Sequence, residues 1–557
     1  MTDDYAAFRD HVVVFGFRGV GRRIVRQLVA AGQRVVVVDP EADPTEQEDL
    51  QRWGAHYLAG YGHSQDTLHV ACVATARAVL CVTEDDVRNT RLALLVRDLS
   101  PTVRLVVRMA NASVGRAMAV VTEPGQVLNV AELASASFVE AALGRTTHEL
   151  VLDGTSFYIA TVDGDGDGRV GDHHASLTTI AVAGSRTTVL GTADALRHVG
   201  VETSSDAVRA SRPSARRRIR EGLGAVTDAV DRPFRIAFGI LILLALSSVV
   251  ILVIGYEDVD GARMNVLDAT YFTAETIAAV GFGDFYFRDQ DAWLRVWAVV
   301  LILLGIVLVT LSTALLTNAL VTRRLQQSLG RQRVTGMRDH IVVIGLGAVG
   351  SKVATDLRAE GYEVAVIDGG EGERFLPQMR SAGIPVLFGD ATLSETQASA
   401  NVTHAVGVAV LTSDDLINIE TGLAVRGVVG EGQVPIVLRV FSKNLARVIA
   451  SGLDAGIARS IAELAAPWFV GAALGLDVLG TFYVGPRMFT ALRIPVRAGE
   501  PLDGARVSEV GPAVVAVRHA DAVGLEYPPP DGAVLRPGDS AYVVGEYDDL
   551  LRLLTAA

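Results

Sequence analysis

Gly345, Gly347 and Gly350 have the spacing G-x-G-x-x-G and directly follow a run of β-branched residues. This spacing allows a tight turn and lets a pyrophosphate approach the backbone at the start of the next helix. Asp368 ends the following β-branched run, where its carboxylate could accept the hydroxyls of a ribose. These features predict a βαβ unit that binds NAD(H), ATP, ADP or AMP. The alternative is a Rossmann scaffold kept for assembly alone.

A self-comparison of the sequence finds this α/β unit twice. "HVVVFGFRGVG" at His11 matches "HIVVIGLGAVG" at His340, an offset of 329 residues. The offset becomes 331 for "AELASASFVEAALG" at Ala131 and "AELAAPWFVGAALG" at Ala462. Chance cannot hold a register over such a length, so the sequence predicts two related units. We call them the first copy (residues 9–205) and the second copy (residues 339–557).

The glycine motif of the first copy departs from the pattern. It begins with Gly16 and ends with Gly21, but its second glycine is replaced by Arg18. An arginine there would obstruct a pyrophosphate or reach it as a cation. Asp39 takes the place of Asp368. We expect the second copy to be the better nucleotide site.

Other polar residues of the repeat extend the nucleotide-site hypothesis. Asp390 in the "GDAT" stretch of the second copy is replaced by Tyr61 in the first. Arg108 and Arg439 end the equivalent strand in both copies. The two arginines either approach a ligand phosphate or are surface charges. Asp390 and Arg439 therefore join the candidate nucleotide-binding residues.

The stretch after the first Rossmann lobe resembles half of a calcium loop. Asp163, Asp165 and Asp167 occupy positions 1, 3 and 5 of an EF-hand-like pattern. Position 12 is His174, so the bidentate glutamate is missing. The alternative is an Asp-Gly-rich hairpin turn on the surface.

Two apolar segments, 236–255 and 296–317, contain no charged residue over 20 and 22 residues. Each is long enough to cross a bilayer as a helix. Arginines flank the outer end of each segment, which predicts a multi-pass protein of the cell membrane with both termini in the cytoplasm. The acidic segment between the spans would then face outside.

Composition limits the class of protein. The net charge of -13 argues against a nucleic-acid partner. The two cysteines, Cys72 and Cys81, exclude a disulfide framework and fit a reducing cytosol. No His-, Tyr- or Lys-centred catalytic motif follows either glycine turn, so we do not expect an enzyme. The alternative function, which would make the chain an enzyme, is a membrane-tethered, NAD-binding oxidoreductase.

The stretch "LDATYFTAETIAAVGFGD" between the spans resembles the pore module of tetrameric potassium channels. The flanking units resemble RCK domains (regulators of potassium conductance, of TrkA-N and TrkA-C type). The resemblance implies a two-span α-helical membrane pore module plus two α/β Rossmann-type RCK units, each with a small β-rich C-lobe. One unit precedes the pore here, whereas the better-known two-span RCK channels carry theirs after it.

The resemblance also implies a potassium selectivity filter, in which backbone carbonyls replace the hydration shell of K+. The filter residues would be Ala279, Val280, Gly281, Phe282, Gly283 and Asp284, supported by Glu275 and Thr276. Glu275 on the pore helix, from about Asp268 to Ala278, is expected to pair with Asp284. Ala278 and Ala279 lack the hydroxyls usual before the filter, which predicts weaker ion occupancy at its inner end. The alternative is a less selective cation channel.

A homotetramer would need no separate pore subunit and would gather its RCK units into a cytosolic gating ring. Gly305, in the middle of the second span, would be a gating hinge or a site of close helix packing. Calcium-gated RCK channels carry acids after the strand that here reads "VVRMANAS" and "VLRVFSKN". Neither copy has an acid there, so we do not expect that calcium site.

The expected domains follow from the repeat and the spans. They are the first Rossmann lobe 9–125, the first crossover and C-lobe 126–205, a basic linker 206–233, the pore module 234–320, a linker 321–338, the second Rossmann lobe 339–455, and the second crossover and C-lobe 456–557.

Overall fold

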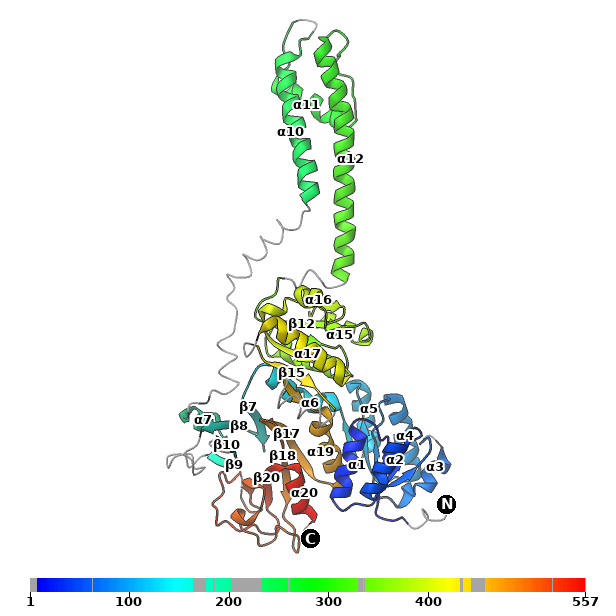
Figure 1. Ribbon diagram of the computed structural model, residues 1–557, viewed down its shortest axis with the longest axis vertical. Coiled ribbons are helices and arrows are strands. Elements are labelled where there is room, and N and C mark those ends of the chain that lie inside the picture. Colours follow the sequence, from blue (N-terminus) through cyan, green and yellow to red (C-terminus); the bar gives the residue numbers. More distant parts are fainter. Residues whose placement is uncertain are drawn as a thin grey trace. The chain divides into compact units, whose positions relative to one another are not determined.

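The computed structural model describes residues 8–62, 64–163, 177–183, 186–199, 201, 232–258, 261–328, 334, 336–430, 434–441, 456–522 and 524–555. Side chains are described for these residues except 163, 183, 232–235, 318–328 and 554–555. The chain forms two compact units, one from residues 1–211 and 333–557 and the other from residues 212–332 (Figure 1). The first unit holds both copies of the repeat, and the second holds the apolar helices.

Six parallel strands form the Rossmann-type sheet of the first copy, in the order β3-β2-β1-β4-β5-β6. The strand order reverses between β1 and β4, so the carboxyl ends of these strands border a crevice. The strands are β1 (Val12–Phe15), β2 (Val35–Val38), β3 (His56–Leu58), β4 (Ala78–Cys81), β5 (Arg104–Arg108) and β6 (Gly125–Leu128). The helices are α1 (Val20–Ala30), α2 (Pro44–Trp53), α3 (Gln65–Val70), α4 (Asp86–Leu99) and α5 (Ala112–Thr122).

The second copy repeats this sheet in the order β13-β12-β11-β14-β15-β16. The strands are β11 (His340–Ile344), β12 (Val364–Asp368), β13 (Val386–Phe388), β14 (Ala405–Val410), β15 (Ile436–Arg439) and β16 (Ile457–Arg459). The helices are α14 (Ala348–Ala359), α15 (Leu376–Ser381), α16 (Ser394–Ser399) and α17 (Asp415–Val429). Asp85 caps α4, and Asp414 at the equivalent position caps α17. The predicted repeat is therefore confirmed down to its helix caps.

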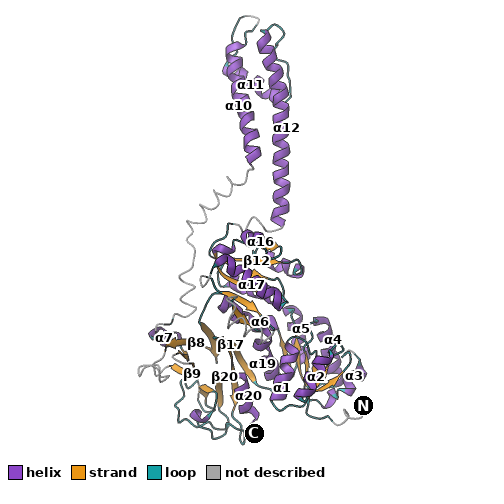
Figure 2. Ribbon diagram, in the orientation of Figure 1, coloured by secondary structure: helices purple, strands orange, loops and turns teal. Residues whose placement is uncertain are grey.

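Each copy ends in a four-stranded antiparallel sheet, which confirms the predicted β-rich C-lobe (Figure 2). The first, β7-β8-β10-β9, contains β7 (Thr147–Leu152), β8 (Thr155–Asp163), β9 (Leu177–Ala183) and β10 (Arg186–Gly191), and α7 (Ala193–His198) follows it. The second, β17-β18-β20-β19, contains β17 (Asp477–Val484), β18 (Arg487–Pro495), β19 (Ala513–Arg518) and β20 (Ser540–Glu546), and α20 (Tyr547–Thr555) follows it. Phe157 of the first sheet and Phe482 of the second share one core.

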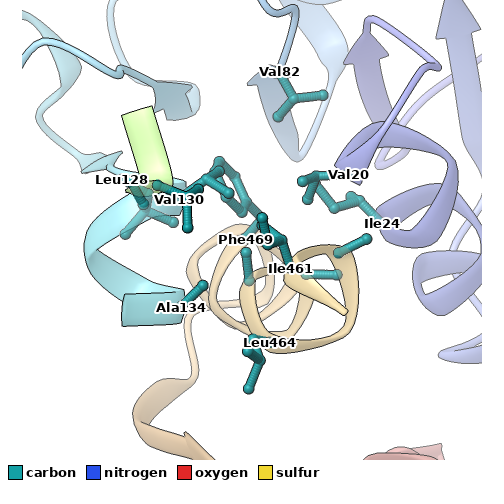
Figure 3. Packing of buried hydrophobic residues seen from close by; sticks show 14 of the residues in the cluster. Val20, Ile24, Val82, Leu128, Val130, Ala134, Ile461, Leu464 and Phe469 are labelled. Carbon is teal, nitrogen blue, oxygen red and sulfur yellow. The ribbon is translucent and has the colours of Figure 1, made fainter. Parts of the chain in front are cut away.

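Helices α6 (Val130–Ala142) and α19 (Ile461–Leu474) interlock the two copies. Helix α19 of the second copy packs on α1 of the first, and α6 of the first packs on α14 of the second. Figure 3 shows Ile461 and Phe469 of α19 beside Val20 and Ile24 of α1, within one buried cluster. Because each crossover helix completes the core of the other copy, we expect neither copy to fold alone.

The unit of residues 212–332 contains the two predicted apolar helices, α10 (Arg232–Gly255) and α12 (Ala292–Ser328). The prediction of these helices is confirmed. Ile236–Gly255 and Ala292–Thr317 are long enough to cross a membrane, and each contains an 18-residue stretch of high mean hydropathy, 3.0 and 2.9 respectively. Helix α11 (Val266–Ile277) is too short to cross and packs against both. The second apolar helix begins at Ala292, four residues before the predicted start of the span.

Candidate functional site

The pore segment follows α11, the short helix between the two spans. The side chain of Asn265 caps the start of this helix by accepting a backbone hydrogen bond. At its end, the amides of Ala279 and Val280 donate to the carbonyls of Thr276 and Glu275, at 3.1 and 2.9 Å. The helix therefore leads directly into the predicted filter, and its negative dipole end lies beside that segment.

The backbone of the filter segment alternates in handedness. Ala279, Gly281 and Gly283 have φ values of +55°, +62° and +82°, whereas Val280 and Phe282 between them have negative φ. In an extended strand successive carbonyls point to opposite sides, but this alternation turns them toward the same side. The segment can therefore present a row of carbonyl oxygens to a dehydrated cation.

Ala279 holds a conformation that alanine rarely adopts. A residue with a Cβ at positive φ costs roughly 1–2 kcal/mol. Ala279 nevertheless keeps the left-handed conformation, and Ala278 before it is right-handed and ends the helix. The lack of side-chain hydroxyls at Ala278 and Ala279 therefore does not prevent the left-handed backbone conformation in the predicted filter segment.

Asp284 is held by Tyr271, which was not among the predicted site residues. Its carboxylate accepts a hydrogen bond from the Tyr271 hydroxyl at 2.9 Å. The Tyr271 ring also lies nearly parallel to the Phe282 ring, with centroids 6.3 Å apart. Among the described residues no hydrogen bond joins Glu275 to Asp284, so the expected pair of carboxyls stays a prediction beside the observed Tyr271–Asp284 hydrogen bond. Glu275 is only 7% exposed, so it is not solvated either.

Gly305 lies in a continuous stretch of α12 and faces the end of the pore helix. A Cβ added at Gly305 would lie 3.4 Å from a side-chain carbon of Ile277 and 3.5 Å from its Cα. These are ordinary van der Waals separations, so the glycine brings α12 close to α11. This geometry supports the close-packing alternative, and the hinge role stays a prediction.

At two positions of the motif in the second copy, nearby backbone atoms leave no room for a Cβ, so glycine is required. Gly345 has φ +97°, and a Cβ there would lie 2.9 Å from the backbone nitrogen of Thr412. At Gly350 a Cβ would lie 1.9 Å from the carbonyl oxygen of Gly345. At Gly347, by contrast, no described atom lies within 4 Å of the Cβ position. The space beside the start of α14 is therefore open where a phosphate would approach.

Asp368 is buried and organises the loop that follows its strand. Its Oδ1 accepts a hydrogen bond from the Leu346 amide at 2.7 Å, and its Oδ2 accepts one from the Gly370 amide at 2.9 Å. In the first copy, Asp39 accepts a hydrogen bond from the Phe17 amide at 2.8 Å in the same way. These acids tie the glycine loop to the next strand, a role that the expected ribose contact did not include.

Asp390 lies in an exposed turn after β13. It accepts hydrogen bonds from the amide and hydroxyl of Thr392, at 2.9 and 2.7 Å. The side-chain hydrogen bond from Thr392 holds the pKa of Asp390 below its ordinary value. In the first copy, Tyr61 at this position is 50% exposed and lines the cleft beside the first glycine motif.

The equivalent cleft of the first copy is partly filled by charged side chains. It has a volume of about 310 Å³ and is lined by residues that include Gly16, Arg18, Asp39, Tyr61, Thr83 and Glu84. Arg18 forms an ion pair with Glu41 at 3.3 Å on the wall of this cleft. A Cβ at Gly21 would lie 2.2 Å from the carbonyl oxygen of Gly16, so the turn itself is preserved. The departure from the motif therefore changes the contents of the cleft and not its backbone.

Arg108 and Arg439 line one small cavity of about 90 Å³ where the two copies meet. Burial lowers the pKa of Arg439 to about 10 and also lowers the pKa of Arg108. The alternative of two surface charges is therefore wrong. The Glu84 carboxylate lies 3.8 Å from Arg108. Glu84 was not predicted as a site residue, although the aligned stretches "TEDD" and "TSDD" show the acid in one copy only.

The calcium loop falls mainly on residues outside the described part of the chain. Asp163 is the last residue of β8, while Asp165 and Asp167 lie outside the described residues. Within the described ranges, no cluster of three or more His, Cys, Asp and Glu residues could hold a metal ion. The calcium loop stays a prediction.

Comparison with protein families assigns three domains. Residues 12–121 and 341–460 match the TrkA-N domain, and residues 238–322 match the ion channel domain. The first two ranges coincide with the Rossmann lobes, and the third contains the apolar helices and the filter segment. The comparison agrees with the RCK and pore resemblances.

Two curated relatives share parts of the chain. The glutathione-regulated potassium-efflux system protein KefC of Cronobacter sakazakii is 30% identical over 107 residues, 19% of this chain and 17% of KefC. An uncharacterised protein of Methanothermus fervidus is 22% identical over 160 residues, 28% of this chain and 25% of that protein. The chain therefore spans a quarter or less of the length of these relatives.

Solved structures extend the likeness over the whole chain. The GsuK channel bound to NAD has a TM-score of 0.50 and 16% identity, covering 100% of this chain and 80% of that chain. The GsuK RCK domain has the same TM-score and identity and is covered to 97%. This likeness shows the fold. The chain therefore contains one ion channel domain between two TrkA-N domains, and it shares its fold with the GsuK structures.

Proposed function

We propose that four copies of the chain form a potassium-selective pore that cytosolic RCK domains gate in response to a nucleotide. The alternating φ values at Ala279, Gly281 and Gly283 carry this proposal, because they align carbonyl oxygens along one side. The name of KefC, a potassium-efflux protein, supports K+ as the permeant ion. Liposomes that contain the purified protein should take up rubidium, a potassium substitute. Failure to take up rubidium when a control channel does would count against the pore.

The regulatory ligand is an adenine nucleotide or dinucleotide at the second glycine loop. The open space at Gly347 supports this site, and the likeness to a GsuK channel bound to NAD supports NAD as the first ligand to test. The residues that would contact or shape the ligand site are Gly345, Gly347, Gly350, Asp368, Asp390 and Arg439. Mass spectrometry of the nucleotide that co-purifies with the chain would identify the ligand. Recovery of calcium without any nucleotide would overturn this choice and favour the predicted calcium loop.

A membrane-tethered, NAD-dependent oxidoreductase is the competing function, because the two Rossmann lobes fit it as well. An oxidoreductase would have no use for the alternating positive and negative φ values of the pore segment. We infer that the chain has no catalytic role. Turnover of NADH by the purified protein, with any hydride acceptor, would favour the enzyme.

Both termini and both RCK copies belong in the cytoplasm, with the acidic segment between the spans outside. The arginines that flank the spans support this orientation in the cell membrane. A reporter that is active only in the cytoplasm should therefore be active when it is fused after Ala557.

Ala279→Thr should strengthen barium block from the cytoplasmic side. The threonine hydroxyl would add one oxygen per subunit at the innermost ion site, and we expect at least a threefold lower blocking concentration, about 0.7 kcal/mol. Single-channel recording with internal barium measures this change. Ala262→Thr, at an exposed position outside the filter, is the control. Equal block of both variants and wild type would show that the missing hydroxyl is irrelevant.

Gly305→Ala tests the hinge. The added methyl group fits beside Ile277, so the variant should fold. If bending at Gly305 opens the pore, alanine stiffens the helix by about 1 kcal/mol, and the open probability should fall about fivefold. Gly239→Ala in α10, where the Cβ position is free of neighbours in the described chain, is the control. An unchanged open probability would assign Gly305 to packing alone.

Helices α4 and α17 carry exposed apolar residues at equivalent positions, which we assign to contacts between chains in the ring. Val87 and Leu94 on α4 are 78% and 51% exposed, and Leu416 and Leu423 on α17 are 70% and 40% exposed. Val87→Glu combined with Leu416→Glu should split the assembly, as measured by light scattering after size exclusion. Val120→Glu, at a valine that is 80% exposed on α5, is the control. An intact assembly in the double variant would contradict this assignment.

A further inference from the structure

A small cavity between the two copies has the size of a single oxyanion. We call it the interlobe pocket; its volume is about 90 Å³ and its lining includes Gly19, Glu84, Arg108, Ala348, Arg439 and Phe441. Gly19 and Ala348 stand at the starts of α1 and α14, whose positive dipole ends therefore border the pocket.

The interlobe pocket concentrates positive charge. Arg108 Nη1 and Arg439 Nε are buried, and neither atom has a hydrogen-bond partner among the described residues. The Arg439 guanidinium also lies 4.5 Å from the centre of the Phe441 ring. Two buried like charges are costly unless an anion lies between or beside them. The pocket is therefore built to hold a negative group.

Glu84 provides that negative group from inside the chain. Its Oε1 lies 3.8 Å from Arg108 Nη1 and 3.1 Å from the position of a Cβ at Gly19, at the start of α1. The Glu84 side chain is 69% exposed, so it can move away without leaving a hole in the core. An ion pair with a partner this exposed contributes little stability, so a stronger anion can replace it.

The repeat shows that the fold does not require this acid. The equivalent of Glu84 in the second copy is Ser413, and the equivalent of Arg18 is Gly347. Thr83 and Thr412, which precede Glu84 and Ser413, make the same hydrogen bonds to Asn89 and Asn418. The turn therefore forms with either residue, and the carboxylate is a specific feature of the first copy.

We propose that the interlobe pocket is an exchangeable oxyanion site, in which Glu84 neutralises Arg108 and Arg439 until a phosphate group of the bound nucleotide displaces it. Ala348 lines the pocket and directly follows Gly347, so a phosphate at the second glycine loop would border the pocket that the two arginines line. The displaced carboxylate belongs to the first copy, so ligand binding to one copy changes the contact with the other. The same carboxylate repels phosphate from the first glycine loop. This inference rests on the proposed nucleotide site.

The test is calorimetric titration of the purified full-length chain with ADP and, separately, with inorganic phosphate. Glu84→Gln keeps the size of the side chain and removes the competing charge. We expect the variant to bind ADP about tenfold more tightly than wild type, a change of about 1.4 kcal/mol, and to bind inorganic phosphate measurably. Glu41→Gln, which removes an acid of the first cleft outside the interlobe pocket, should leave both affinities unchanged. Thermal unfolding of each variant checks that it is folded.

The outcomes separate the two proposals. If wild type binds no nucleotide but Glu84→Gln binds phosphate, the nucleotide function fails and the oxyanion site stands. Adding Arg439→Leu to Glu84→Gln should then abolish phosphate binding. If Glu84→Gln and wild type bind ADP and phosphate with equal affinity, the exchange of Glu84 for phosphate is overturned.

Discussion

Gly281→Ala should abolish potassium current through the assembled channel. Gly281 has φ +62°, and no described atom lies within 4 Å of the Cβ position. The cost is therefore backbone strain and not a clash, roughly 1–2 kcal/mol per subunit and about 4–8 kcal/mol for four subunits around one axis. We expect the segment to relax and turn a carbonyl away from the ion path. Planar-bilayer recording measures the loss.

Gly261→Ala is the matched control for this variant. Gly261 has φ +75°, and the described chain again leaves its Cβ position open, but it lies in the segment before the pore helix. Gly261→Ala should cause the same backbone strain and leave the potassium current normal. Normal current in Gly281→Ala would refute the carbonyl row, and loss of current in both variants would show that folding had failed.

Gly347→Arg should abolish nucleotide binding to the second copy. The substitution places the residue of the first copy, Arg18, at the open position beside α14. An arginine there would fill the space that a pyrophosphate needs, and we expect an affinity loss of at least 100-fold, about 2.7 kcal/mol. Calorimetric titration with NAD measures the affinity. Channel opening should lose its dependence on nucleotide in parallel.

Two further variants make this result specific. Gly511→Arg adds the same side chain to an exposed loop position of the second C-lobe, where no described atom lies within 4 Å of the Cβ position, and should bind NAD normally. Arg18→Gly should not weaken binding, because the first cleft is not the main site. If Gly347→Arg binds NAD with an affinity within about threefold of wild type, the ligand binds at another site.

The fold was predictable where the signals are local or repeated. The β-branched runs before Gly16 and Gly345 fix strand and turn because only glycine fits the crowding at these positions. The offset of 329 residues then extends the prediction from one copy to the other. The two spans were predictable for a different reason, since hydrocarbon length alone requires an uncharged helix of about 20 residues.

The arrangement of the copies was not predictable in this way. The sequences of α6 and α19 predict apolar helices, but nothing local states that each helix packs on the other copy. The choice of partner depends on long-range shape complementarity, as in the packing of Phe469 against Val20 and Ile24. Arg108 and Arg439 are buried where the two copies pack together, so their burial could not be predicted from the sequence either.

In the pore, the sequence predicted the positions of the glycines but not the hydrogen bond between Tyr271 and Asp284. Tyr271 lies one helical turn before Glu275, and both side chains are on the same helix. The two side chains differ in length, so their spacing on the helix does not tell which of them reaches Asp284. The interlocked copies also give the proposed gating a physical route, because a ligand that moves Glu84 acts on both copies at once.

The most direct test of the central claim is the reversal potential of purified protein in a planar bilayer, with KCl on one side and NaCl on the other. NAD is added to the cytoplasmic face. We predict a reversal potential displaced far toward the potassium equilibrium potential, and an open probability that changes with NAD. A reversal potential near zero, which means equal permeability to sodium and potassium, would contradict the selective filter.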